Sequence, residues 1–178
     1  MASPIPDSRF PIRGSRGFTL IELLVVVVIV AVMAGALTLA IGGVGGERKL
    51  AYQAEQTQAL IRYACEQAEL TGRSIGLSLK RDGYRFSQFE RQDWVAFGPG
   101  ELRARNWLDT TNAFLSRDGR RVTIAPDYPE KPQLVCFSSG ELTPFVLDMT
   151  LSDLPIRYRL DGQPDGDIKI ASIDDRAR

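Results

Sequence analysis

The stretch RGFTLIE at residues 16–22, followed by LLVVVVIVAVMAGAL at residues 23–37, decides the architecture of this chain. Residues 23–37 contain no polar side chain. Together with residues 38–41, they reach about the length that a helix needs to cross the hydrocarbon core of a membrane. The segment therefore predicts a membrane helix close to the N-terminus. The total of 178 residues leaves room for one further domain of modest size.

The residues before the apolar segment are basic. Arg9, Arg13 and Arg16 precede it, with only Asp7 against them. Basic flanks stay on the cytoplasmic side of a membrane. We therefore expect a cytoplasmic N-terminus and a single span, with the residues after Gly46 on the opposite side of the membrane.

Two ordinary kinds of N-terminal segment offer alternatives. A secretory signal also has a basic start and an apolar core, but small residues at A-x-A spacing would follow that core. Here the small residues at 34–36 lie inside the apolar run. A plain membrane anchor is the second alternative. Neither explains Glu22, because a carboxylate near the start of an apolar run is costly in lipid and indicates a function.

The stretch at residues 16–22 resembles the type IV prepilin motif, in which a basic leader, a glycine and a phenylalanine precede a glutamate at the fifth position of the mature chain. The resemblance covers residues 13–41. It implies that a membrane aspartyl prepilin peptidase cuts between Gly17 and Phe18, and that the new Phe18 amine is N-methylated. A glycine suits this bond, because a residue without Cβ lets the backbone lie extended in a tight site. The resemblance also implies that Glu22 pairs with the Phe18 amine of a neighbouring subunit in the low-dielectric core of a filament.

A cluster of glycines, GGVGG at residues 42–46, follows the apolar segment. A phosphate-binding loop would follow a β-strand, so we interpret this cluster as a weak point or kink in the helix. Apolar and small side chains then recur at three- and four-residue steps, which predicts an amphipathic helix that packs on a sheet and stops at Thr71-Gly72. The recurring positions are Leu50, Ala54, Thr57, Leu60, Ile61, Ala64 and Ala68.

The chain after Gly72 is typical of β-structure. Alternating apolar residues, separated by turn residues such as Arg81-Asp82-Gly83, predict about six to eight antiparallel strands. We expect residues 134–149 to form a central hairpin and residues 101–119 to form an irregular loop. The predicted strands are residues 75–79, 84–86, 94–97, 121–124, 134–137, 145–149, 156–160 and 168–172.

These patterns predict an α+β, pilin-like fold. A long N-terminal helix, with a transmembrane first half and an amphipathic second half, packs on an antiparallel β-sheet domain. The expected organisation is a cleaved leader at residues 1–17, a transmembrane helix with its glycine-rich exit at 18–46, an amphipathic helix at 47–72 and a periplasmic β-rich domain at 73–178.

The β-rich part resembles the H-type minor pseudopilins of type II secretion, the GspH/FimT family. The resemblance is carried by CFSSGELTPF at residues 136–145, by AELTGR at 68–73 with IGL at 75–77, and by YRF at 84–86. It implies a non-enzymatic, low-copy subunit at or near the tip of a pseudopilus, which supports the export of folded proteins across the outer membrane. The subunit would be anchored in the inner membrane, with its C-terminal domain in the periplasm.

The implied partners are the prepilin peptidase, other minor and major pseudopilins and secreted exoproteins. A minor type IV pilin that acts in pilus assembly or DNA uptake is the nearest alternative. DNA binding would need clustered arginines, and Arg103, Arg105, Arg117, Arg120 and Arg121 are the candidates, which we interpret as solvated loop charges. Three of the 22 basic and two of the 22 acidic residues precede Glu47, which leaves 19 basic and 20 acidic residues. This balance argues against nucleic-acid binding.

The composition also argues against an enzyme. The chain contains no histidine, which excludes Ser-His-Asp and Cys-His nucleophilic sites and HExxH zinc sites. No base or nucleophile accompanies the acid pairs Asp165 with Asp167 and Asp174 with Asp175. The segment at residues 161–167 has oxygen ligands at alternating positions but lacks the closing glutamate of a calcium loop, so we expect a hairpin turn. We predict no catalytic residue, no metal and no cofactor; a membrane-tethered periplasmic binding protein remains the alternative of another class.

The chain has two cysteines, Cys65 and Cys136. Their wide separation does not match a metal-binding motif. In an oxidising compartment they could pair in a disulfide, and otherwise each would be a small buried apolar residue. We expect partner contacts at the stretch of residues 98–120, because loops on a rigid scaffold often carry such contacts.

Overall fold

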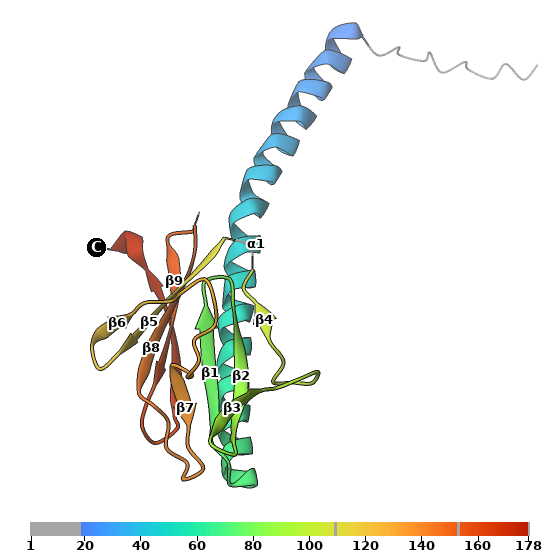
Figure 1. Ribbon diagram of the computed structural model, residues 1–178. Helices are drawn as coiled ribbons and strands as arrows, with labels where there is room; N and C mark the ends of the chain where they lie inside the picture. The colour runs from blue at the N-terminus through green and yellow to red at the C-terminus, as the bar shows by residue number, and fades with distance from the viewer. Residues whose placement is uncertain (1–18, 109, 153, 178) are drawn as a thin grey trace, which may run out of the picture. The chain divides into compact units, whose positions relative to one another are not determined.

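The computed structural model describes residues 19–108, 110–152 and 154–177, without the side chains of residues 35–44 and 177. Figure 1 shows one long helix, α1 (Leu20–Thr71), followed by strands that form two antiparallel sheets. A short 3-10 helix, η1 (Asp175–Ala177), ends the described chain. The chain divides into two compact units between Ile41 and Gly42, and each is described by itself below.

The first unit contains the start of α1. The carbonyl oxygen of Thr19 accepts a hydrogen bond of 3.0 Å from the backbone amide of Glu22, and its Oγ1 lies 3.4 Å from the same nitrogen. Thr19 therefore caps the helix, with Glu22 in the first turn, where a carboxylate also favours the helix dipole. The large apolar side chains between Leu20 and Met33 are all exposed. Among the residues that the structure describes, no helix combines the length and the apolar character that crossing a membrane requires.

The second unit begins with the rest of α1, which stays helical through the glycine cluster at residues 42–46. The predicted amphipathic pattern is confirmed, because all seven recurring positions from Leu50 to Ala68 are buried. The helix ends where it was expected to end. Gly72 has a φ of 65°, and Arg73 donates its backbone amide to the Ala68 carbonyl at 3.2 Å, which is the hydrogen bond of a Schellman cap.

The first sheet has the strand order β3-β2-β1-β7, with β4 beside β2. Its strands are β1 (Ile75–Lys80), β2 (Gly83–Glu90), β3 (Asp93–Ala96), β4 (Arg105–Asn106) and β7 (Leu134–Cys136). The predicted turn at Arg81-Asp82 joins β1 to β2, in a register that pairs Leu77 with Phe86. Both side chains belong to the core that this sheet shares with α1.

The second sheet has the order β10-β9-β8-β5-β6. Its strands are β5 (Thr111–Arg117), β6 (Arg120–Val122), β8 (Phe145–Leu151), β9 (Ile156–Gly162) and β10 (Ile168–Asp174). The predicted final pair is confirmed, with Leu160 opposite Ile170. Leu147, Met149 and Leu160 from this sheet join the same core as the α1 side chains, so one core serves both sheets.

Two predictions about the strands were wrong. Residues 101–119 are not an irregular loop, because they contain β4 and β5, and β5 is an interior strand whose Leu115 is fully buried. Residues 134–149 are not a hairpin either. Strand β7 pairs with β1 in the first sheet, whereas β8 pairs with β5 and β9 in the second. Within residues 134–149 of the described chain, Cys136 and Leu142 form an isolated antiparallel bridge.

A proline-containing strap, residues 125–133, lies on the first sheet, on the face opposite to the core. Gly76 is needed beneath it, because a Cβ there would overlap the Pro132 ring. The Arg85 guanidinium lies over the Tyr128 ring at 4.4 Å. Gln133 bonds to both backbone groups of Leu79, accepting from its amide at 2.7 Å and donating to its carbonyl at 3.0 Å. The strap therefore covers the sheet face that the core does not use.

A Gly162→Ala substitution should destabilise the domain by about 1–3 kcal/mol, because the added methyl group overpacks the core. Gly162 lies directly opposite Phe145, and a Cβ there would overlap the Phe145 ring, which is itself buried. Denaturant unfolding of the detergent-extracted chain would measure the change. Gly98→Ala is the matched control, because a Cβ there meets open space. Equal midpoints for the two variants would show that the Phe145 ring can move aside at no cost.

Candidate functional site

A disulfide joins Cys65 on α1 to Cys136 on β7. The two Cα atoms are 4.9 Å apart, and the residues are 7% and 4% exposed. The alternative of two separate buried thiols therefore does not apply to this structure. The crosslink attaches the last turns of the helix to the edge of the first sheet, and it closes a segment with a sequence separation of 71.

A buried polar contact attaches α1 at Gln53 to the segment around residues 108–111. The Gln53 side-chain oxygen accepts hydrogen bonds from the Leu108 amide at 3.2 Å and from the Thr111 hydroxyl at 3.5 Å. One turn further along, the Thr57 hydroxyl lies against the buried phenol of Tyr84, and burial raises the pKa of that phenol. These bonds fix the helix over the segment between β4 and β5.

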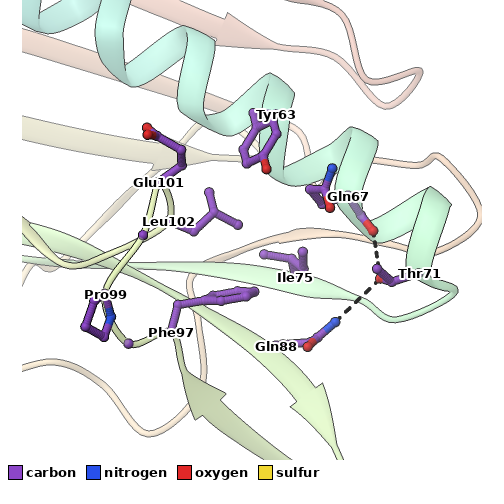
Figure 2. A pocket seen from close by; sticks show the side chains of 11 residues that line it. Tyr63, Gln67, Thr71, Ile75, Gln88, Phe97, Pro99, Glu101 and Leu102 are labelled. Atoms are coloured by element: carbon purple, nitrogen blue, oxygen red, sulfur yellow. Dashed lines mark hydrogen bonds between the residues drawn. The ribbon is translucent and has the colours of Figure 1, made fainter.

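Beside the end of the helix lies a groove of about 250 Å³, shown in Figure 2. Tyr63, Gln67 and Thr71 of α1 form one wall, and the opposite wall comes from β2 and the segment at residues 97–102. The Thr71 hydroxyl donates to the Gln67 carbonyl at 2.7 Å and lies 3.5 Å from the Gln88 side-chain nitrogen. The rest of the lining is mostly apolar and includes Ile75, Phe97, Pro99 and Leu102.

The stretch at residues 98–120 thus differs in character along its length. Residues 98–102 line the groove, whereas Trp107, Thr111 and Leu115 are buried and belong to the body of the domain. The arginines of this stretch and its neighbourhood do not form one cluster. Arg103 and Arg105 donate to the carbonyls of residues 100 and 101 on the groove segment. The others lie on the second sheet: Arg117 donates to the Gln133 carbonyl at 2.9 Å, and Arg121 lies over the Phe114 ring at 4.6 Å.

The acidic candidates are engaged within the chain. Asp167 forms an ion pair with Arg62 at 3.0 Å, and its amide donates to the Asp165 carboxylate at 3.1 Å. Asp175 pairs with Arg157 at 3.3 Å. Residues 163–167 connect β9 to β10, so the predicted hairpin turn is confirmed. Across the described ranges, no three side chains of the metal-binding types come together.

The residues predicted for processing, Gly17 and Phe18, lie outside the described residues. Glu22 is exposed in the first turn of α1. The helical periodicity of the sequence could not predict the groove or the exposed face of α1, because it identifies only the buried positions of the helix. The exposed aromatic residues on the polar side of the helix, Tyr52 and Tyr63, were the available signal.

Residues 12–38 match the prokaryotic N-terminal methylation motif. The chain is 37% identical over 145 residues to the type II secretion system protein H of Pseudomonas aeruginosa, across 76% of this chain and 83% of that protein. It is 33% identical over 154 residues to the protein of the same name from Aeromonas hydrophila, across 80% of this chain and 84% of the relative.

The fold is similar to that of solved pseudopilins. The minor pseudopilin EpsH from the type 2 secretion system of Vibrio cholerae matches with a TM-score of 0.59 and 18% identity, over 70% of this chain and 97% of that one. The solution structure of Escherichia coli GspH matches with a TM-score of 0.55 and 19% identity, over 70% and 88%. The predicted α+β, pilin-like fold is therefore confirmed. Together with the sequence relatives, these likenesses show that the chain belongs to the type II secretion system protein H family, the H-type minor pseudopilins.

Proposed function

We propose that this minor pseudopilin acts as a low-copy, non-enzymatic subunit at or near the tip of a periplasmic pseudopilus and supports the export of folded proteins across the outer membrane. Family membership implies a structural subunit that interacts with the other pseudopilins of its system. The observation that carries the proposal is the combination of a methylation motif at residues 12–38 with a pilin-like domain after it. The secreted exoproteins would be contacted at this tip position.

The proposed topology is a single inner-membrane span with a cytoplasmic N-terminus and a periplasmic domain. The motif and the family support inner-membrane anchoring. The basic residues before the apolar segment support the orientation. The Cys65–Cys136 disulfide supports it independently, because disulfides persist in the oxidising periplasm and are rare in the cytosol.

The proposed maturation is cleavage between Gly17 and Phe18 by a prepilin peptidase, followed by methylation of the Phe18 amine. The new N-terminus would then precede the helix cap at Thr19 by one residue, and Glu22 would stand at position five of the mature chain.

Intact-mass measurement of the membrane-extracted chain tests this proposal directly. Production together with a prepilin peptidase should remove residues 1–17 and add one methyl group, and production without the peptidase should leave the full chain. A Gly17→Val variant is the control, because a β-branched side chain at the scissile position should block cleavage by steric bulk. An unchanged mass of the native chain, or cleavage after the apolar segment, would remove the basis for the filament role.

A further inference from the structure

A cavity of about 370 Å³ opens beside β5, on the side of the second sheet where β6 ends. Residues 112–114 of β5, residues 121–124 and Arg81 line this cavity, and we refer to it as the β5 slot. Its size lies in the range of about 300–1,000 Å³ that is typical of ligand pockets. The slot shares no residue with the groove beside α1, and Figure 1 shows β6 and the second half of α1 on opposite sides of the domain. It is therefore a separate candidate site.

The β5 slot exists because the pairing of β5 with β6 stops early. The last paired residues are Leu115 and Val122, and in the described chain residues 123 and 124 form no backbone hydrogen bond with β5. On its other side, β5 stays paired with β8 as far as Thr111. Backbone groups along a strand point alternately to its two sides. Part of the backbone of residues 112–114 therefore faces the slot without a partner strand, as at the edge of a sheet.

The segment after β6 is held away from β5 by contacts with the rest of the domain. The Arg81 amide donates a hydrogen bond of 2.9 Å to the Ala125 carbonyl, which attaches this segment to the turn between β1 and β2. Val122 and Ile124 are partly buried and pack against the core. Closing the slot with the chain's own residues would break these contacts, so the slot stays available to an added strand.

The charge of the β5 slot is positive. Arg81 and Arg121 are both exposed, and among the described residues that line the slot none is acidic. The Arg121 guanidinium lies over the Phe114 ring, and in the described chain neither arginine side chain forms a hydrogen bond or an ion pair. The acidic residue next to Arg81, Asp82, is paired with Lys80 at 3.0 Å. Because guanidinium groups bind carboxylates well, the slot favours an acidic ligand.

We propose that the β5 slot binds an extended, acidic segment of a secreted protein. The segment would add a short strand beside residues 112–114, and one of its carboxylates would meet Arg81 and Arg121. The proposal rests on the proposed function, in which this subunit meets exported proteins. A permanent contact between subunits buries a larger and more apolar surface than this slot offers. A short, charged slot instead gives weak and reversible binding, which the release of a transported protein requires.

Fluorescence anisotropy with the detergent-extracted full chain tests the chemistry of the β5 slot. The probe is a fluorescent, acetylated and amidated pentapeptide in which valine and glutamate alternate. It should bind saturably. Replacing its glutamates with lysine should weaken binding at least about ten-fold because of charge repulsion, and methylating its backbone amides should do the same because it removes the donors of an added strand. Equal binding of the three peptides, or no saturable binding of the first, would overturn the proposal.

Charge reversal of the chain tests whether the peptide binds at the β5 slot. Arg81→Glu with Arg121→Glu should weaken binding of the glutamate peptide at least about ten-fold and strengthen binding of the lysine peptide, which also shows that the variant is folded. Arg48→Glu with Arg91→Glu is the matched control, because both arginines are exposed and lie outside the slot. Equal affinity of the slot variant and the native chain, or an equal loss in both variants, would place the binding elsewhere and refute the assignment.

Photocrosslinking in secreting cells tests the source of the ligand. A photoreactive phenylalanine at position 114 should give an adduct with a secreted protein, identified by mass. The same group at position 137 is the control, because Phe137 is 42% exposed and lies outside the slot. An adduct at position 114 with another pseudopilin alone, or no adduct, would contradict the proposed ligand. Leader cleavage and co-purification with pseudopili, measured in the same cells, report the proposed function separately, and peptide binding to the extracted chain depends on neither.

Discussion

A Glu22→Gln chain is expected to lose its leader and gain its methyl group as the native chain does, but to enter the pseudopilus at about a hundredth of the native level or less. Removing one partner of a buried ion pair costs about 3–5 kcal/mol, because the other charge stays buried and unpaired. Each 1.4 kcal/mol corresponds to about a factor of ten in an equilibrium. Glu22→Ala should behave in the same way, with processing intact and assembly lost.

The glutamine variant separates two roles that Glu22 could have. The structure places Glu22 three residues after the capping residue Thr19, which is the spacing of a capping box. Glutamine serves a capping box as well as glutamate does, but it carries no charge. If capping were the main role, the glutamine variant would assemble normally, and if pairing with the Phe18 amine is the main role, it fails.

Thr19→Ala is the matched control for this experiment. It removes the hydroxyl that caps the helix and leaves the carboxylate in place, at an expected cost of about 1 kcal/mol in local helix stability. Assembly is measured as the fraction of cleaved, methylated chain that co-purifies with sheared or cross-linked pseudopili. Normal incorporation of Glu22→Gln, or loss of incorporation in Thr19→Ala alone, would contradict the pairing role.

The sequence predicted the helix and the local hairpins well, because their signals are local. The period of small and apolar residues from Leu50 to Ala68 marks the buried side of α1 wherever the sheets lie. The Arg81-Asp82 turn and the pairing of β9 with β10 join neighbours in the chain. The glycine cap at Gly72 likewise depends on the backbone of a single residue.

The wrong predictions involve partners that are distant in the sequence. Strand β7 resembles the first half of a hairpin, but its hydrogen bonds go to β1, nearly sixty residues earlier. Strand β5 buries only Thr111 and Leu115, with Ala113 half-buried and Phe114 exposed between them, so its pattern is too weak to recognise without β8 beside it. The strap over Gly76 also depends on a partner that is distant in the sequence. The prolines at 126, 129 and 132 indicate an extended segment, but they do not indicate which surface it covers.

The candidate functional residues likewise include some that form a contiguous motif and some that only the fold brings together. The residues predicted for processing and assembly form a contiguous motif at residues 16–22, which can be recognised without knowledge of the fold. The groove beside α1 depends on where residues 97–102 pass, so only the packed domain reveals it.

Replacing both cysteines with alanine is expected to lower the free energy of unfolding by about 2–5 kcal/mol. The crosslink closes a segment with a sequence separation of 71, for which loss of chain entropy in the unfolded state gives about 4 kcal/mol. Alanine is chosen because a serine hydroxyl at these buried positions would add an unpaired polar group. For a domain of this size, the melting temperature should fall by roughly 8–20 °C.

Thermal and denaturant unfolding of the detergent-extracted full chain would measure this change under non-reducing conditions. A reductant provides an internal control, because it should weaken the native chain by a similar amount and leave the double-alanine variant unaffected. Equal stability of the two chains without reductant would mean that native-state interactions, and not the crosslink, hold the helix on the sheet.

The position of the disulfide also predicts where the loss of stability should appear. Cys65 lies two residues after Tyr63 of the groove wall, so this end of α1 is covalently attached to β7. Loss of the crosslink should therefore increase hydrogen exchange at the end of α1 more than near Leu50, which is fully buried and far from Cys65 along the helix. A uniform increase along the helix would show that the crosslink stabilises the domain as a whole without specifically ordering the end of α1.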